Sequence, residues 1–244
     1  MNLSGNTVLI TGGSSGIGFA LASRFNGSGS KVIICGRDMD KLDEAKRLLP
    51  GITAYQCDVS NEEERNLLFN KTINEFPELN IIVNNAGIQQ RIKLTEPPEW
   101  SCIKKEIEIN LMAQIHMSLL FIPHLLKAKN PAILNITSGL AFSPLAIVPV
   151  YCSTKAAFHS FTLSLRHQLT GTSLRVVEIA PPAVQTDLGG KGLHDFGTPL
   201  DEFADAVMPE LEKDKIEITY GFSSKSSRAS RDELDEMFNR MNNG

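Results

Sequence analysis

Seven short apolar runs, rich in β-branched residues, alternate along the chain with longer segments whose apolar residues recur at helical spacing. We predict strands at 7–10, 31–35, 53–57, 81–84, 132–136, 174–179 and 216–220. We predict helices at 17–26, 40–49, 62–76, 100–127, 153–169 and 199–211. Strands and helices in this regular succession form right-handed crossovers, which build a parallel sheet. The sequence therefore predicts a doubly wound α/β fold, with a seven-stranded parallel sheet flanked by helices on both faces.

Size and charge limit the other possibilities. The 244 residues suit a single domain over 1–244, and a formal net charge of −4 gives no basic stripe for nucleic acid. The N-terminal residues lack a basic segment followed by an apolar run, and no stretch reaches the roughly 18 apolar residues of a membrane span. We therefore expect a cytoplasmic protein with neither a nucleic-acid nor a membrane partner.

The cysteines and histidines suggest no metal site. Four cysteines are scattered without a C-x-x-C pair, so we expect reduced, buried thiols. His159 and His167 fall on one predicted helix without a carboxylate or cysteine at ligand spacing. The cysteines are Cys35, Cys57, Cys102 and Cys152.

Two segments lack a clear pattern. The segment 188–199 holds four glycines and no apolar periodicity, which predicts a mobile flap over a substrate. The polar tail at 222–244 is either a frayed end or a short helix over 231–241. In the flap, His194 and Asp195 are either contacts for a polar substrate group or solvated loop residues.

A glycine-rich turn, Thr-Gly-Gly-Ser-Ser-Gly-Ile-Gly over 11–18, joins the first strand to the first helix. Glycines permit positive φ and bring backbone N–H groups and a helix N-terminus up to a pyrophosphate. In this strand–turn–helix context the motif predicts a dinucleotide site of the Rossmann fold. The alternative is a tight turn without a ligand. The expected cofactor contacts here are Gly12, Ser14, Ser15, Gly16, Ile17 and Gly18.

The end of the second strand indicates which dinucleotide binds. A carboxylate at this point would bind the 2′-hydroxyl of NAD, whereas Gly36 leaves room and Arg37 offers a charged fork for a 2′-phosphate. We therefore expect NADP rather than NAD. The alternatives are that Arg37 is a solvated surface residue, or that pairing with Asp38 weakens the preference.

Four more motifs follow in order. Asn84-Asn85-Ala86-Gly87 closes the fourth strand, Asn110 lies in Ile-Asn-Leu, Ser138 follows the fifth strand, and Tyr151 precedes Lys155 by four residues. Together with the glycine-rich turn, they resemble the short-chain dehydrogenase/reductase family over most of the chain. Three stretches are also similar to the DltE-type oxidoreductases of that family: 32–37, 138–142 and 180–184.

The residues themselves suggest the chemistry. Hydride transfer to a carbonyl carbon leaves charge on the oxygen, which needs a proton donor and a hydrogen-bond partner. Tyr151 and Lys155 share a helix face, so the ammonium would lower the phenol pKa from its usual value of about 10.

The resemblance implies that Tyr151 is the general acid/base and that Lys155 also binds a ribose hydroxyl. It implies that Ser138 binds the substrate carbonyl and that Asn110 holds a water in a proton relay. Taken singly, Ser138 also fits a helix cap, and Asn110 a residue bonded to its own helix. The Tyr151–Lys155 pair also fits an amphipathic helix surface.

The resemblance extends to the rest of the cofactor site. Asp58 and Val59 would lie at the adenine, and Asn85, Ala86 and Gly87 along the adenosine ribose. Asp58 has an equal alternative as the N-cap of the next helix, for which the spacing of Ser60 is better.

The chain departs from the family pattern after the sixth strand, where Pro181-Pro182 replaces Pro-Gly. Proline fixes φ and removes a backbone donor. We therefore expect a rearranged but functional clamp for the nicotinamide, formed by Pro181, Val184 and Thr186.

The leading function is reversible hydride transfer between NADP(H) and a carbonyl or secondary alcohol. The alternatives are a non-catalytic dinucleotide sensor or scaffold, and an epimerase or dehydratase that uses the same tyrosine. Five residues predict either a hydrophobic substrate or core packing: Leu140, Phe142, Pro144, Leu145 and Ile147. Surplus apolar residues on the two long helices predict a homodimer or homotetramer: Ile107, Leu111, Phe158 and Phe161.

Overall fold

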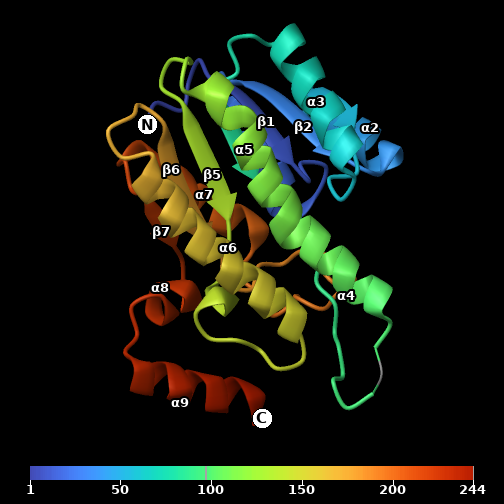
Figure 1. The fold of residues 1–244 in the computed structure, drawn as a ribbon, viewed down its shortest axis with the longest axis vertical. Helices are drawn as coiled ribbons and strands as arrows, with labels where there is room; N and C mark the ends of the chain where they lie inside the picture. The colour runs from blue at the N-terminus through green and yellow to red at the C-terminus, as the bar shows by residue number, and fades with distance from the viewer. Residues whose placement is uncertain (97, 244) are drawn as a thin grey trace.

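The computed structural model describes residues 1–96 and 98–243, and its centre is one sheet of seven parallel strands (Figure 1). The strands are β1 (Thr7–Thr11), β2 (Lys31–Gly36), β3 (Thr53–Gln56), β4 (Ile81–Asn84), β5 (Ala132–Ile136), β6 (Arg175–Ala180) and β7 (Glu217–Thr219). Their order is β3-β2-β1-β4-β5-β6-β7, so the direction of winding reverses between β1 and β4. In such sheets the crevice at this reversal, beyond the carboxyl ends of the strands, is where ligands bind. The predicted fold class is confirmed.

Helices cover both faces of the sheet, which explains why the strands are apolar on both sides. Val8 and Ile10 of β1 pack under α1 (Gly16–Gly27), α2 (Met39–Leu48) and α7 (Leu200–Glu212). Leu9, between them, faces α3 (Glu62–Glu75), α5 (Ala113–Leu125) and α6 (Pro149–Gln168). In Figure 1, α5 and α6 cross the near face of the sheet and α7 lies behind it.

Two predicted helices differ from those observed. The helix expected over 100–127 is divided into α4 (Trp100–Ile107), the π-helix η1 (Glu108–Met112) and α5. The helix expected from residue 153 begins four residues earlier, because Pro149 occupies the first helical position, where its fixed φ and missing N–H cost nothing. Tyr151 therefore lies inside the first turn of α6.

The N-cap of α3 also differs from the prediction. Oδ1 of Asn61 accepts hydrogen bonds from the backbone N–H groups of Glu63 at 2.9 Å and Glu64 at 3.4 Å. Ser60 is therefore not the cap, and neither is Asp58. Asp58 instead accepts bonds from the N–H and hydroxyl of Ser60, which leaves its carboxylate at the carboxyl edge of the sheet.

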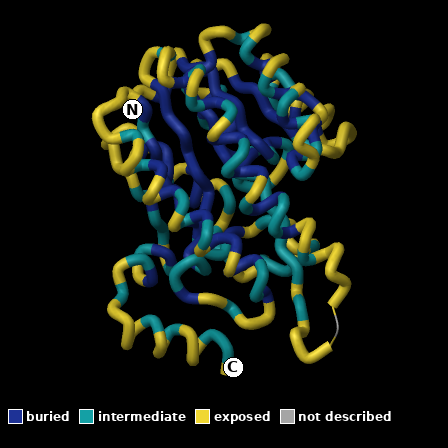
Figure 2. Tube along the Cα trace, in the orientation of Figure 1, coloured by how far each residue is buried: buried dark blue, intermediate teal, exposed yellow. Residues whose placement is uncertain are grey.

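The tail folds into α8 (Phe222–Ser226) and α9 (Arg231–Asn242), beyond the carboxyl edge of the sheet (Figure 1). A capping box between Ser230 and Glu233 starts α9, and no residue of α9 is buried (Figure 2). Asn242 ties α9 to the loop before α6, because its Oδ1 accepts from Ala146 N at 2.6 Å and its Nδ2 donates to Pro144 O at 3.2 Å.

Two expectations about side-chain exposure were wrong. Phe158 is fully buried in α6, so it contributes nothing to an apolar surface. Cys102 is exposed near the start of α4, whereas the other three cysteines are buried. Within the described residues, no helix has the length and apolar character to cross a membrane.

Candidate active site

A cavity of about 1370 Å³ opens at the carboxyl edge of the sheet, where the winding reverses. Most of the predicted site residues line it: Gly12, Ser14, Ser15, Gly16, Ile17, Arg37, Asp58, Val59, Asn85, Ala86, Gly87, Ser138, Tyr151, Lys155, Pro181, Val184 and Thr186. Gly18 and Asn110 are buried and lie outside this lining. The structure thus brings residues from distant parts of the sequence to one place.

The glycine-rich turn is packed tightly against the end of β4. Gly12 has a φ of +63°, and a Cβ on it would lie 3.0 Å from the Cα of Ala86. A Cβ on Gly18 would overlap the carbonyl oxygen of Gly12 and the side-chain nitrogen of Asn85. That nitrogen donates to Thr11 O at 2.9 Å and to Gly12 O at 3.2 Å. The turn therefore has room only for glycine at these positions.

The N-terminus of α1 fits a pyrophosphate. Ser15, the N-cap residue, makes no side-chain capping bond, so the first N–H groups of α1 have no side-chain acceptor. Such donors, together with the helix dipole, favour an anion. The residues present therefore fit a dinucleotide.

At the end of the cavity where the sequence analysis expected the adenosine, Arg37 is exposed at the rim. Asp38 does not pair with it among the described residues, because the Asp38 carboxylate caps α2 by accepting from Lys41 N at 3.2 Å. A Cβ on Gly36 would lie 3.3 Å from the hydroxyl oxygen of Ser14, so glycine keeps this corner open. The guanidinium of Arg37 is left available to a ligand.

Asp58 is held ionised at the same end. Its burial opposes ionisation, but the bonds from Ser60 and the charges of Lys105 and Arg37 outweigh that cost and lower the pKa of Asp58. Lys105 was missed in the sequence analysis. The helical spacing of α4 gives no sign of it, because Lys105 and Asp58 are far apart in the sequence and only the folded chain brings the two charges together.

Tyr151 is buried at the start of α6, and Ser138 lies beside it after β5. Ser138 is indeed a cap, since its hydroxyl oxygen accepts from Leu140 N at 3.1 Å at the start of the 3₁₀-helix η2 (Gly139–Ala141). Burial raises the pKa of Tyr151 well above its usual value, and interaction with the Ser138 hydroxyl works against that rise. The phenol is therefore held protonated in the protein alone.

Among the described residues, Lys155 makes no hydrogen bond to Tyr151, and its amine contacts the end of β5. Its Nζ donates to Ile136 O at 2.8 Å and lies 5.7 Å from the centroid of the Tyr151 ring. Burial lowers the pKa of Lys155 to about 8. The amine therefore lies at the end of β5, and burial disfavours its charged form.

Asn110 occupies the π-helix η1 and is fully buried. Its side chain does not bond its own helix. Its Nδ2 donates to Ile88 O at 2.8 Å, and its Oδ1 accepts from Ile88 N at 2.8 Å. A Cβ on Gly87 would lie 3.4 Å from Asn110 Oδ1 and 3.9 Å from Lys155 Nζ, so the three residues are neighbours.

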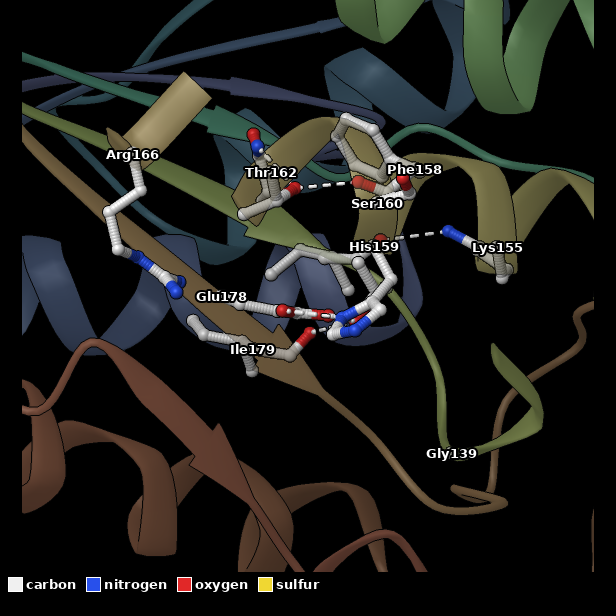
Figure 3. A network of polar contacts seen from close by, with 12 residues as sticks. Gly139, Lys155, Phe158, His159, Ser160, Thr162, Arg166, Glu178 and Ile179 are labelled. Carbon is white, nitrogen blue, oxygen red and sulfur yellow. Dashed lines mark hydrogen bonds and ion pairs between the residues drawn. The ribbon is translucent and has the colours of Figure 1, made fainter. Parts of the chain in front are cut away.

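A contact between the partly buried His159 and the buried Glu178 joins α6 to the sheet near Lys155 (Figure 3). Nδ1 of His159, one turn beyond Lys155, lies 2.9 Å from both carboxylate oxygens of Glu178 on β6, and this bond raises the pKa of His159. The Thr137 hydroxyl donates to Glu178 at 2.6 Å, and Thr137 directly precedes Ser138. Spacing along one helix could not have revealed this partner.

The loop after β6 closes the end of the cavity beside Ser138, where the sequence analysis expected the nicotinamide. The carbonyl of Pro181 accepts from Gly139 N at 2.8 Å, which ties the two-proline loop to the turn after Ser138. Val184 pairs with Thr198 in a short bridge, and a Cβ on Gly16 would lie 3.4 Å from the Thr186 methyl. The loop therefore turns back towards the N-terminus of α1.

The side of the cavity where the sequence analysis expected the substrate has apolar lining residues. Leu140, Leu145 and Ile147 line it, whereas Phe142 packs edge-on against His159 with ring centroids 4.8 Å apart. The lining residues that the sequence analysis did not single out include Gln90, Arg91, Phe222 and Met241. Arg91 follows the Asn-Asn-Ala-Gly motif by four residues, and this position could have indicated a place near the cavity. No feature of the tail sequence indicated Met241.

Comparisons with known proteins agree with this arrangement. Residues 6–195 match the family model described as short chain dehydrogenase. The uncharacterized oxidoreductase DltE of Bacillus subtilis is 47% identical over 99% of this chain and 98% of its own length. A short-chain dehydrogenase from Sphingobium yanoikuyae in complex with NADPH is 26% identical, with a TM-score of 0.80 over 88% of this chain and 87% of its own.

A 3-ketoacyl-(acyl-carrier-protein) reductase from Brucella melitensis complexed with NADH is 28% identical. Its TM-score is 0.82 over 91% of this chain and 99% of its own. Similar structures therefore hold either dinucleotide.

Proposed function

The chain belongs to the short-chain dehydrogenase/reductase family, and we propose that it transfers hydride between NADP(H) and a carbonyl or secondary alcohol. One observation carries this proposal. Tyr151, Ser138 and Lys155 meet on one wall of a cavity that the glycine-rich turn bounds elsewhere. When bound, the nicotinamide supplies or accepts the hydride.

The chain's own residues provide the proton chemistry. In reduction, Tyr151 donates its proton to the carbonyl oxygen, while the Ser138 hydroxyl donates a hydrogen bond to the same oxygen. Lys155 favours the resulting phenolate when it is protonated. Asn110 and Lys155 both lie beside Gly87, and in this proposal Asn110 holds a water in a proton relay that ends at Lys155.

The experiment for this function follows NADPH absorbance with a panel of aldehydes, ketones and quinones. The apolar lining favours substrates with a hydrophobic body. Oxidation of NADPH by at least one such compound is the expected result. Tight NADPH binding without any oxidation would instead support the dinucleotide sensor, which the two-proline loop favours.

We also propose a preference for NADP, which rests on Arg37 and the open corner at Gly36. Arg37→Ala is expected to weaken NADPH binding by about 10- to 100-fold, the range for a lost charge-assisted bond, and to leave NADH binding within about threefold. Fluorescence titration with each dinucleotide measures both constants. The matched control is Arg47→Ala, because Arg47 is an exposed arginine on α2, the helix that follows Arg37, and lies outside the cavity. Equal losses for NADPH and NADH would contradict the preference.

We propose that the protein self-associates through α5 and α6. Met112, Leu119 and Leu163 expose large apolar side chains on and beside these helices. Sedimentation at micromolar concentration is expected to show a dimer or tetramer. A monomer would contradict this proposal, and Leu119→Glu is expected to shift the population towards monomer.

A further inference from the structure

Glu106 is a buried carboxyl group that the proposed proton chemistry does not use. It lies near the end of α4 with an exposed fraction of 0%. Its Oε1 accepts one hydrogen bond, from Gln90 N at 3.1 Å. Within the described residues its Oε2 has no partner. A buried carboxylate normally has several donors or a cation, so a single neutral donor leaves the charged form poorly compensated.

The charged groups around Glu106 do not neutralise it. On its own helical segment, Lys104 pairs with Glu108 at 3.6 Å, and Lys105 acts on Asp58. On the preceding loop, Arg91 is exposed and acts on His194. Burial therefore raises the pKa of Glu106 to about 7, and only the Gln90 N–H opposes the rise.

Two titratable groups of α6, which packs against α4, lie within reach of this charge. They are Tyr151 and Cys152, and a negative charge on Glu106 raises the pKa of each. Burial also raises the pKa of Cys152. Among the described residues, Glu106 is thus an acid that ionises close to neutral pH and whose charge acts on Tyr151.

We propose that Glu106 is a positioning residue of the active site, which supports turnover as a neutral acid and slows hydride transfer when it ionises. The proposal rests on the proposed function. In either direction of reaction, negative charge is shared between the substrate oxygen and the Tyr151 oxygen at the transition state. A carboxylate nearby disfavours that charge, whereas a neutral carboxyl does not.

The same carboxyl holds a segment of the cavity wall. The backbone N–H of Gln90 donates to Glu106, and the Gln90 side chain donates to Cys102 O at 2.8 Å. The neighbouring Gln89 contacts the glycine-rich segment after β6, because a Cβ on Gly189 would lie 3.1 Å from the carbonyl oxygen of Gln89. Glu106 thus connects the surroundings of Tyr151 to the substrate side of the cavity.

The deciding experiment compares wild type, Glu106→Gln and Glu108→Gln across pH 5.5–8.5. Wild-type kcat is expected to fall by about tenfold, the equivalent of one pKa unit, as the pH rises through about 7. Glu106→Gln keeps an acceptor oxygen for Gln90 N–H but cannot ionise. It should therefore lose this fall in kcat while the KM for the carbonyl stays within about twofold.

Glu108→Gln removes the same charge from a partly exposed position two residues away, and its profile should match wild type. Superimposed profiles for wild type and Glu106→Gln would overturn the proposal. So would a Glu106→Gln variant with a tenfold higher KM and an unchanged pH dependence, since that result indicates a purely structural role.

A second measurement is independent of turnover. Carbon-13 NMR of carboxyl-labelled protein should show one glutamate titrating near neutral pH in wild type and absent from Glu106→Gln. Titration of every glutamate below about pH 5.5 would overturn the proposal, even in an active enzyme. If wild type oxidises no NADPH but this resonance is present, the proposed function fails while the assignment of a neutral buried acid stands.

Discussion

Tyr151→Phe is expected to reduce kcat for carbonyl reduction by about 10²- to 10⁴-fold, the usual contribution of a positioned general acid. The substitution removes one hydroxyl and keeps the ring, which is buried between Val148 and Cys152. NADPH binding should therefore remain within about threefold of wild type. Stopped-flow absorbance and fluorescence titration measure the two quantities separately.

Tyr220→Phe is the matched control for this variant. This substitution likewise removes one phenolic hydroxyl, which in Tyr220 donates to Glu202 at 2.6 Å, but Tyr220 does not line the cavity. Its kcat should stay within about twofold of wild type. If Tyr151→Phe retained a tenth or more of the wild-type kcat, Tyr151 would not be the proton donor.

Gly18→Ala is expected to abolish useful cofactor binding and to destabilise the fold. The added methyl group would overlap the carbonyl oxygen of Gly12 and the side-chain nitrogen of Asn85, neither of which is free to move away. The turn or α1 must therefore shift. Overpacking of this kind costs about 1–3 kcal/mol of unfolding free energy. We expect NADPH affinity to fall at least about 30-fold, which corresponds to about 2 kcal/mol.

Gly27→Ala, at the other end of α1, provides the control. A Cβ on Gly27 would meet no atom within 4 Å, so this substitution should raise the unfolding free energy by up to about 1 kcal/mol. Urea denaturation and NADPH titration of both variants make the comparison. Wild-type affinity in Gly18→Ala would show that the turn does not hold the dinucleotide.

The fold was predictable because its determinants are local. Each strand is a short apolar run, and each helix has apolar residues at helical spacing. The glycine-rich turn is recognisable because it lies between the first strand and the first helix. The positions of Ser138 and Tyr151 were predictable for a related reason. Ser138 follows the end of β5 by two residues, and Tyr151 lies two residues after the start of α6.

What sequence reasoning missed depends on contacts between distant segments. The bond from Lys155 to Ile136 O is one such contact, and only the packing of α6 on β5 creates it. The pairing of His159 with Glu178 depends on the same packing. The burial of Glu106 could not be inferred either, because its neighbours Lys104, Lys105 and Glu108 predict a solvated helix surface.

The π-helix η1 allows Asn110 and the apolar residues that follow it to face two different parts of the structure. Successive residues of an α-helix are rotated by about 100°, so one residue more or less turns everything beyond it to another side. The wider turn at Glu108–Met112 takes in an additional residue, as π-bulges do. This lets the Asn110 amide reach the backbone of Ile88 while Ala113, Met117 and Phe121 still face the sheet. With a continuous α-helix, either the Asn110 amide would not reach Ile88 or the apolar residues after it would not face the sheet.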